Sequence, residues 1–420
     1  MGALDKVIGY EGIKRELRQL LDMMKNRERY ETLGAKMPRG LLISGDPGLG
    51  KSLMARCFME ELGWKSYTVR RNRPDGDFVR ELDRVFQEAA ENAPAVILLD
   101  DMDKFVVEYE GREEYVAVQA GIDAVAGKNV YVIATANDLR ELPDSLLRSG
   151  RFDHKIKVEP PRGKDADQII AYYLKQKAVG KSINSSDVAK MLRGGSCADL
   201  ETVLNEAAIF AGFDNSEKIE MSHVVEAALR FEYGVLDGDD DCDNARLQRT
   251  AYHEAGHAVA HDLFREGSVG LVSIRPRRRG PGGFMRSCME PESDVHHVLV
   301  SLAGAAAVEL RFGTKDTGAT HDFRRAQSRV RSAVGDDAAS GFALLEDLHH
   351  NSEELLSRME FATGVALERY MTMTRMLLAQ NRDYLDAVAR ELMEKGTLLN
   401  SDMRRIRAAH TATLPRFASA

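Results

Sequence analysis

The chain has 420 residues, 44% hydrophobic and 30% charged, which is enough for two or three globular domains. Its net charge of -8 argues against neutralising a nucleic-acid backbone, so we expect no nucleic-acid partner. The four cysteines are widely spaced and form no C-x-x-C pair, so the sequence indicates neither a thiolate zinc site nor a disulfide scaffold, and a reducing compartment fits.

The first 160 residues alternate short apolar runs with stretches of helical periodicity. Continuous apolar runs are typical of strands in a parallel sheet with helices on both faces. We therefore predict an α/β domain over residues 1–160. Its strands are expected at 40–45, 65–69, 95–100, 130–136 and 155–159.

A phosphate-binding motif follows the first of these strands. The stretch GDPGLGKS, at 45–52, fits G-x-x-x-x-G-K-[ST] and precedes a helical pattern. In this motif, backbone N–H groups surround phosphate oxygens, the lysine reaches the outer phosphates and the hydroxyl binds Mg²⁺. We expect a nucleoside triphosphate to contact Gly45, Asp46, Pro47, Gly48, Leu49, Gly50, Lys51, Ser52 and Leu53.

Other polar residues that this chemistry needs come at the ends of later strands. Asp100 and Asp101 follow a buried strand and suit an Mg²⁺ ion held through water, while Asn137 follows another and suits a water beside the terminal phosphate. Arg148 and Arg151 are candidates for arginines that act on the nucleotide of a neighbouring subunit. Ordinary surface arginines are the alternative.

The pattern of predicted elements changes after residue 160. Only helical signals occur over 161–235, which predicts a small helical domain. Residues 236–246 are acidic and nearly free of apolar side chains, as expected of a linker. The remainder, 247–420, is predicted to be a mainly helical domain with a strand-like segment at 269–276. Its longest apolar run, 298–308, is shorter than the roughly 18 residues that span a bilayer, so we expect a soluble, cytoplasmic chain.

The stretch AYHEAGHAVAHDL, at 251–263, is a candidate metal site. His253 and His257 lie one helical turn apart on one face, so both imidazoles can reach the same ion. In H-E-x-x-H sites the glutamate, here Glu254, binds no metal but accepts the proton of the attacking water. His261 is about 12 Å from His253 along the helix, too far to share the ion, and we expect it on the helix surface.

A third metal ligand is needed from elsewhere in the chain, because no further histidine follows the motif at a suitable distance. The residues alone leave several candidates: Asp294, His296, His297, Glu309, His321 and Asp322.

The two halves together resemble the FtsH-type AAA metalloproteases, a family of hexameric, ATP-driven, zinc-dependent proteases. Seven segments resemble the family in its order. They are GAKMPRGLLISGDPGLGKSLMA, ATANDLRELPDSLLRSGRFDHKIKV, GGSCADLETVLNEAAIFA, TAYHEAGHAVAH, SLAGAAAVELRFG, DTGATHDFRRA and LMEKGTLL.

The resemblance implies an α/β P-loop AAA+ module, a parallel sheet with a helical lid, followed by a mainly α-helical zinc metallopeptidase domain. It implies Zn²⁺, ATP and Mg²⁺ as cofactors, protein substrates and a homohexamer. It points to Asp322 as the third zinc ligand, to Ile8 and Gly9 as adenine contacts and to Asn137 as the phosphate sensor. By the same resemblance, Arg148 and Arg151 act on the neighbouring subunit's ATP.

Three departures from the family pattern bear on function. Asp101 stands where the family has a water-polarising glutamate, and Pro74 and Gly76 fall where it has a pore-loop aromatic and glycine. The family's N-terminal transmembrane helices have no counterpart in these 420 residues, so we expect membrane attachment only through an anchor that is not present in this chain.

These features favour an ATP-dependent zinc endopeptidase that unfolds and degrades proteins. The altered pore loop leaves open a protein-remodelling AAA+ ATPase whose peptidase domain is silent or structural. Asp101 leaves open the reverse, a competent peptidase with an inactive motor.

Overall fold

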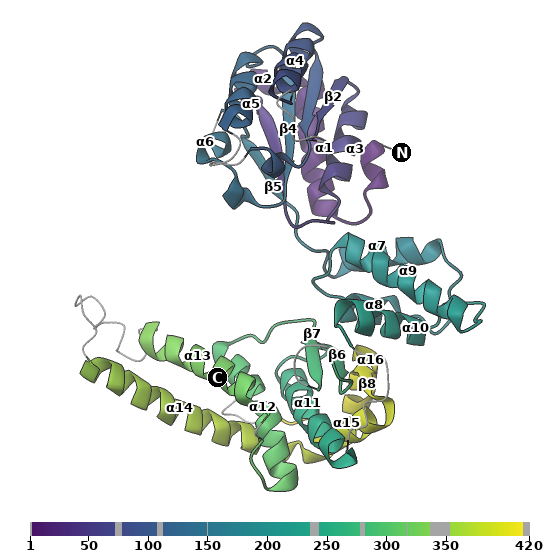
Figure 1. Ribbon diagram of the computed structural model, residues 1–420, viewed down its shortest axis with the longest axis vertical. Coiled ribbons are helices and arrows are strands. Elements are labelled where there is room, and N and C mark those ends of the chain that lie inside the picture. Colours follow the sequence, from purple (N-terminus) through teal and green to yellow (C-terminus); the bar gives the residue numbers. More distant parts are fainter. Residues whose placement is uncertain are drawn as a thin grey trace. The chain divides into compact units, whose positions relative to one another are not determined.

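A computed structural model describes most of the chain (Figure 1). The residues that it describes are 2–71, 78–106, 112–148, 150–235, 243–277, 282–316, 318–336 and 353–414. Pro74 and Gly76, the predicted pore-loop positions, lie outside these ranges. The chain forms two compact units: Met1–Val179 with Gly194–Asn205, and Gly180–Arg193 with Glu206–Ala420.

A five-stranded parallel sheet forms the centre of the first unit (Figure 1). Its strands are β1 (Gly40–Ser44), β2 (Lys65–Val69), β3 (Ala95–Leu99), β4 (Val130–Ala136) and β5 (His154–Lys157). They are ordered β2-β3-β4-β1-β5, and every neighbouring pair is parallel. All five predicted strands are therefore confirmed, and the complete burial of β1 and β3 explains their unbroken apolar sequences.

Helices cover this sheet with amphipathic faces. In α4, the buried side chains Leu82, Val85, Phe86 and Ala89 follow the spacing of one helical face. The helices of this unit are α1 (Glu11–Lys25), α2 (Arg27–Thr32), α3 (Lys51–Leu62), α4 (Phe78–Glu91), α5 (Arg112–Ala124), α6 (Asp144–Leu147) and α7 (Lys164–Lys175). Short 3-10 helices occupy Ala3–Lys6, Met102–Lys104 and Leu139–Glu141.

The strand order decides where the polar residues lie. Strands β3, β4 and β1 are adjacent and run in the same direction, so the residues that follow them meet at one edge of the sheet. Asp100, Asn137 and Gly45 are those residues. The sheet topology therefore brings together the residues that the sequence predicts to bind a triphosphate.

The second unit is mainly helical, as predicted. Its helices are α8 (Ser185–Met191), α10 (Met221–Ala227), a π-helix (Ala228–Glu232), α11 (Asn244–Phe264), α12 (Asp294–Phe312), α13 (Thr320–Asp336), α14 (Glu353–Gln380), α15 (Arg382–Lys395) and α16 (Asn400–Ala408). Residues of α9 (Cys197–Phe213) belong to both units.

A small antiparallel sheet accompanies these helices. Its strands are β6 (Val269–Ser273), β7 (Phe284–Ser287) and β8 (Thr397–Leu399), in the order β7-β6-β8. Strand β6 confirms the segment predicted at 269–276, whereas β7 and β8 were not predicted. Both are too short to show a clear alternation of apolar and polar residues.

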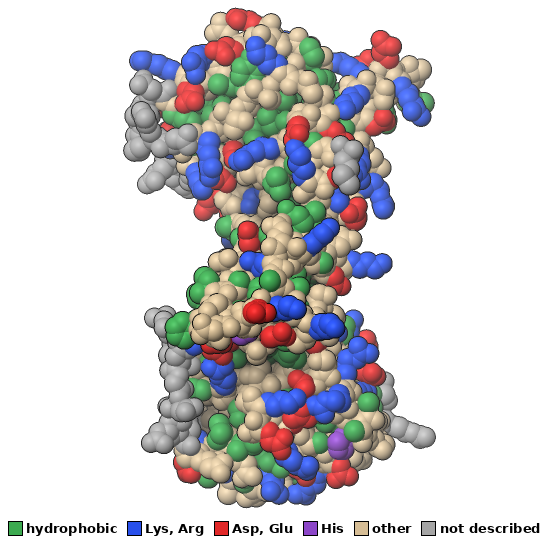
Figure 2. All heavy atoms as spheres, turned by 90° about the vertical axis from the view of Figure 1, so that its right-hand side faces the viewer, with side chains coloured by type: hydrophobic (Ala, Val, Ile, Leu, Met, Phe, Trp, Pro, Cys, Tyr) green, Lys and Arg blue, Asp and Glu red, His purple; other side chains and the backbone are tan. Residues whose placement is uncertain are grey.

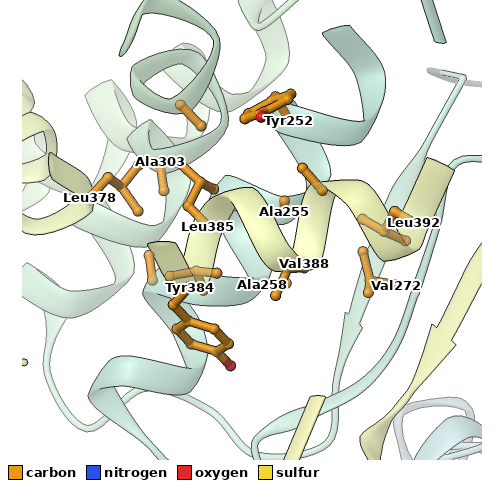
Figure 3. Close-up of a cluster of buried hydrophobic side chains, with 14 of the residues drawn as sticks. Tyr252, Ala255, Ala258, Val272, Ala303, Leu378, Tyr384, Leu385, Val388 and Leu392 are labelled. Carbon is orange, nitrogen blue, oxygen red and sulfur yellow. The ribbon is translucent and has the colours of Figure 1, made fainter. Parts of the chain in front are cut away.

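The core of the second unit lies between α11, α12, α15 and β6. Figure 3 shows Tyr384, Leu385, Val388 and Leu392 of α15 among alanines of α11 and α12 and Val272 of β6. The alanines Ala255, Ala258 and Ala303 are fully buried, and their small side chains allow the helices to approach closely. This close packing fixes the position of α11, which carries the histidine motif.

One described helix, α12, is long and apolar enough to cross a bilayer, although 56% of its apolar window is buried in the protein. It packs against α11, α13 and α14. The core helix of a water-soluble domain meets the same criteria, so α12 is weak grounds for a membrane span.

We expect Leu392→Ala to destabilise the second unit by about 2–5 kcal/mol, because the leucine is fully buried and its removal leaves a cavity. Hydrogen exchange of the α15 amides in the full chain measures this locally and avoids a mixed two-unit melting curve. Leu356→Ala is the control, since Leu356 is 37% exposed on α14. Equal exchange in both variants would contradict the packing.

Candidate active site and nucleotide-binding site

His253 and His257 of α11 direct one nitrogen each toward a common point. Their Nε2 atoms are 3.1 Å apart. The other ring nitrogens have separate partners: His253 Nδ1 is 2.7 Å from Asp316 Oδ2, and His257 Nδ1 is 2.7 Å from the Val300 carbonyl oxygen. Because these acceptors hold a proton on Nδ1, Nε2 is the nitrogen of each ring that can bind an ion once it carries no proton.

Asp322 of α13 completes a triangle with the two histidines. Its Oδ2 is 3.3 Å from His253 Nε2 and 3.5 Å from His257 Nε2. Ligand atoms about 2.0–2.1 Å from a tetrahedral zinc ion lie about 3.3 Å from each other. The three donors therefore have the spacing of a metal site that one further ligand would complete.

Gly304 of α12 leaves the space in which these donors meet. A Cβ atom at this position would lie 2.5 Å from His257 Nε2 and 2.6 Å from His253 Cε1. Contacts this short do not occur in folded proteins without displacement of a group. A side chain at this position would thus collide with both imidazoles.

The other candidates for the third ligand lie elsewhere. Asp294 pairs with Arg329, Glu309 pairs with Arg375, and the ring of His296 stacks on Phe264. His321 is exposed and His297 is half-buried. Within the described ranges, only His253, His257 and Asp322 form a group of three side chains suited to holding a metal.

The protonation equilibria of the site reflect its burial and its paired charges. Burial disfavours a charged His253, but hydrogen bonds with Asp316 and Asp322 raise its pKa to about 10. Burial also opposes ionisation of Asp322, yet hydrogen bonds from both histidines lower the pKa of this carboxyl. A metal ion therefore has to displace a proton shared by these groups.

Glu254 lies beside the histidines and is almost fully buried. Burial raises the pKa of its carboxyl. Gly283, the residue before β7, lies against it, because a Cβ built on Gly283 would come 2.9 Å from Glu254 Oε1. The Glu254 side chain is therefore packed against the residue that precedes β7.

Sequence reasoning was wrong about His261 and missed Asp316. His261 is 3% exposed, not a surface residue, and its Nδ1 is 2.6 Å from Ser268 Oγ in the interior. The sequence contains one indication that Asp316 could contact His253: this carboxylate lies six residues before Asp322 in the same short segment. Spacing could not show that it would face His253.

The first unit assembles the phosphate-binding loop as predicted, between β1 and α3. Lys51 Nζ donates to the Asp46 carbonyl oxygen and to Asn137 Oδ1, both at 2.8 Å. Burial lowers the pKa of Lys51 against the attraction of nearby aspartates. A Cβ on Gly45, which has φ of 145°, would clash with the Val158 carbonyl oxygen. The loop therefore depends on glycine there.

Asp100 connects the loop to the centre of the sheet. Its Oδ1 accepts hydrogen bonds from Ser52 Oγ at 2.6 Å and Thr135 Oγ1 at 2.8 Å. Asp100 is 1% exposed, so these contacts hold a buried carboxylate beside the hydroxyl predicted to bind Mg²⁺. Two hydrogen-bonded pairs, Lys51 with Asn137 and Ser52 with Asp100, thus begin at neighbouring residues of α3.

The predicted adenine contacts, Ile8 and Gly9, precede α1. Gly9 is buried against the backbone of Asp165, and the next amide, Tyr10 N–H, donates to Asp165 Oδ1 at 2.7 Å. The turn at residues 8–10 is therefore held against the start of α7.

The two predicted arginine fingers differ in environment. Arg148 is exposed at the end of α6. Arg151 donates to the Ser145 carbonyl oxygen at 2.6 Å and pairs with Asp123 at 3.0 Å within its own subunit. Of the two, Arg148 has the environment expected of a side chain that reaches a neighbouring molecule.

Comparisons with known proteins assign the two parts of the chain to two families. Residues 41–160 match the ATPase family associated with various cellular activities (AAA), and residues 242–406 match peptidase family M41. The fold and the two sites define an AAA ATPase joined to a metallopeptidase.

The relatives identify the family. The chain is 30% identical to the ATP-dependent zinc metalloprotease FtsH of Thermus thermophilus, over 95% of this chain and 69% of the relative. It is 31% identical to FtsH 2 of Symbiobacterium thermophilum, over 96% and 74%. It is 32% identical to FtsH 1 of the same organism, over 94% and 70%. The chain belongs to the FtsH family of ATP-dependent zinc metalloproteases.

We expect Gly304→Ala to abolish stoichiometric zinc binding, because the new methyl group would occupy the space between the histidines. Zinc content of the purified full chain, measured by atomic emission, tests this. Gly364→Ala is the matched control, since a Cβ on this α14 glycine meets no atom within 4 Å. Normal zinc content in the Gly304 variant would show that the triangle is not the metal site.

We expect Asp316→Ala to weaken zinc binding by roughly 10–100-fold, the usual effect of removing a carboxylate that orients a metal-binding histidine. Competition with a chromophoric chelator gives the dissociation constant. Asp316→Asn should retain part of the affinity, because the amide oxygen still accepts the Nδ1 hydrogen bond. An unchanged dissociation constant in the alanine variant would contradict the orienting role.

Proposed function

We propose that this chain is an ATP-dependent zinc metalloendopeptidase that unfolds and degrades proteins as a homohexamer. The observation that carries the peptidase assignment is the triangle of His253 Nε2, His257 Nε2 and Asp322 Oδ2, with sides of 3.1, 3.3 and 3.5 Å. These distances match one shared tetrahedral ion.

His253, His257 and Asp322 would hold the zinc ion, and Gly304 would leave the position open. Bound there, zinc supplies Lewis acidity that favours attack of water on a peptide carbonyl. Asp316 and the Val300 carbonyl oxygen fix the two rings by holding a proton on each Nδ1. The chain thus fixes the donors before a substrate arrives.

Glu254 is the proposed general base. Its carboxylate takes the proton of the attacking water and later delivers it to the leaving amine nitrogen. Burial favours the protonated carboxyl and so makes Glu254 a stronger base than an exposed glutamate. Its place on α11, next to His253, keeps it within reach of the same water.

Strand β7 offers a surface for the substrate backbone. In the described part of the sheet it pairs only with β6, so its other edge has unpaired peptide groups. Gly283 places the beginning of this strand against Glu254. An extended peptide can add to such an edge through main-chain hydrogen bonds, which suits a protease that cleaves many sequences.

The ATPase unit supplies the force for unfolding substrates, which peptide-bond hydrolysis cannot supply. Unfolding a domain must overcome roughly 5–15 kcal/mol, and peptide hydrolysis exerts no force on a folded chain. Lys51 would contact the outer phosphates of ATP, while Ser52 and Asp100 would hold Mg²⁺, which neutralises phosphate charge. Asn137 and Asp101 would orient the attacking water, and Ile8 and Gly9 would contact the adenine.

A ring of subunits follows from the same proposal. Arg148 is exposed and free to act on the ATP of the next subunit, whereas Arg151 would first have to leave Asp123.

The described cysteines Cys57, Cys197 and Cys288 are free thiols, which supports a cytoplasmic, reducing compartment. Acidic and basic side chains are interspersed on the face shown in Figure 2.

The alternative functions make different predictions. A remodelling ATPase with a silent peptidase would hydrolyse ATP without chelator-sensitive proteolysis. A peptidase with an inactive motor would cleave unstructured peptides without ATP and leave folded substrates intact. His253, His257 and Asp322 would leave the fourth position of a tetrahedral ion open, which is the pattern of catalytic zinc sites and favours an active peptidase domain.

We expect Glu254→Gln to lower cleavage of β-casein by roughly 10²–10⁴-fold, the usual contribution of a general base. Zinc content and ATP hydrolysis should stay normal, because the glutamine changes neither the ligands nor the first unit. Glu368→Gln, at an exposed position of α14, is the control. Undiminished casein cleavage by the Glu254 variant would refute the assigned chemistry.

A further inference from the structure

Asp101 occupies the place where this family has a glutamate, and its side chain is one methylene shorter. An error of about 1 Å in the position of a reacting group can cost on the order of a hundredfold in rate. A working motor therefore needs some feature that fixes the shorter carboxylate. The surroundings of Asp101 contain one.

The carboxylate of Asp101 is anchored through a single oxygen. Oδ2 is 3.0 Å from Arg70 Nη2, at the end of β2, and 2.7 Å from Lys104 Nζ, one helical turn further along the chain. The described residues give Oδ1 no hydrogen-bond partner. Both cations thus hold the same oxygen and leave the other one available.

The backbone of Asp101 is anchored as well. The residue has a left-handed conformation with φ of 55°, and its N–H donates to Thr135 Oγ1 at 2.8 Å. Thr135 Oγ1 in turn donates to Asp100 Oδ1, which also accepts from Ser52. The position of Asp101 is therefore linked by hydrogen bonds to the residues predicted to hold Mg²⁺.

We propose that Arg70 and Lys104 are positioning residues for ATP hydrolysis, which hold Oδ2 of Asp101 so that Oδ1 receives the attacking water. The inference rests on the proposed function and explains how an aspartate does the work expected of a glutamate. In this proposal the two cations act through Asp101, the side chain that both of them contact.

Because these ion pairs are exposed, we expect them to orient the Asp101 carboxylate and to add little to the stability of the fold. The side chains of Arg70 and Lys104 are 51% and 59% exposed, and such pairs contribute little to folding because water and salt screen them. Asp101 itself is only 14% exposed. Two exposed cations on one sheltered oxygen restrict its rotation without a large contribution to the fold.

The test is steady-state ATP hydrolysis by the full chain with Arg70→Met, Lys104→Met and the double variant. We expect kcat to fall about 3–10-fold in each single variant and about 10–100-fold in the double variant, with KM for ATP unchanged. Arg70→Lys and Lys104→Arg should restore most of kcat. Lys128→Met, in the turn before β4, is the control for loss of an exposed positive charge.

The same substitutions in an Asp101→Asn background separate positioning from a structural effect. If the cations act through Asp101, their removal there should cause no further loss of kcat. Unchanged or increased kcat in the Arg70 and Lys104 variants would overturn the inference, as would an equal loss in both backgrounds. Full activity of Asp101→Asn alone would instead refute the role that the proposed function gives to Asp101.

Discussion

The convergence of three donor atoms on one point is the constraint on which the peptidase half of this protein depends. Two of the donors come from a single turn of α11 and the third from α13, and Gly304 of α12 leaves the space between them. The alanine-rich packing of α11 against α12 and α15 holds the first helix in place (Figure 3). Without that packing, His253 and His257 would still share a helical face, but Asp322 would not be held within ligand distance.

The ATPase half is built by a different principle, in which strand order replaces helix packing. Parallel neighbours β1, β4 and β3 bring a glycine-rich loop, an amide and a carboxylate to one edge of the sheet. Hydrogen bonds through Thr135 then connect Asp100, the proposed magnesium ligand, to Asp101, the acid proposed to orient water. One chain thus combines a peptidase site fixed by side-chain packing with an ATPase site fixed by backbone topology. The ATPase does the mechanical work that the peptidase cannot.

Sequence reasoning succeeded where chemistry follows from local spacing. The five apolar runs predicted the five strands, and the four-residue interval predicted that His253 and His257 lie on one helical face with their rings close together. It failed where tertiary contacts decide: the residues alone left six candidates for the third ligand, and only a family resemblance selected Asp322. The burial of His261, the pairing of Asp316 with His253 and the pairing of Arg70 with Asp101 depend on segments far apart in sequence, or on the face that a neighbour covers. No local pattern encodes these contacts.

Anomalous diffraction at the zinc absorption edge, on crystals of the zinc-loaded protein, tests the central claim most directly. The account predicts a single strong peak about 2.0–2.2 Å from His253 Nε2, His257 Nε2 and one carboxylate oxygen of Asp322. A peak at another position, or no peak between the imidazoles while Asp322 points away from them, would contradict it.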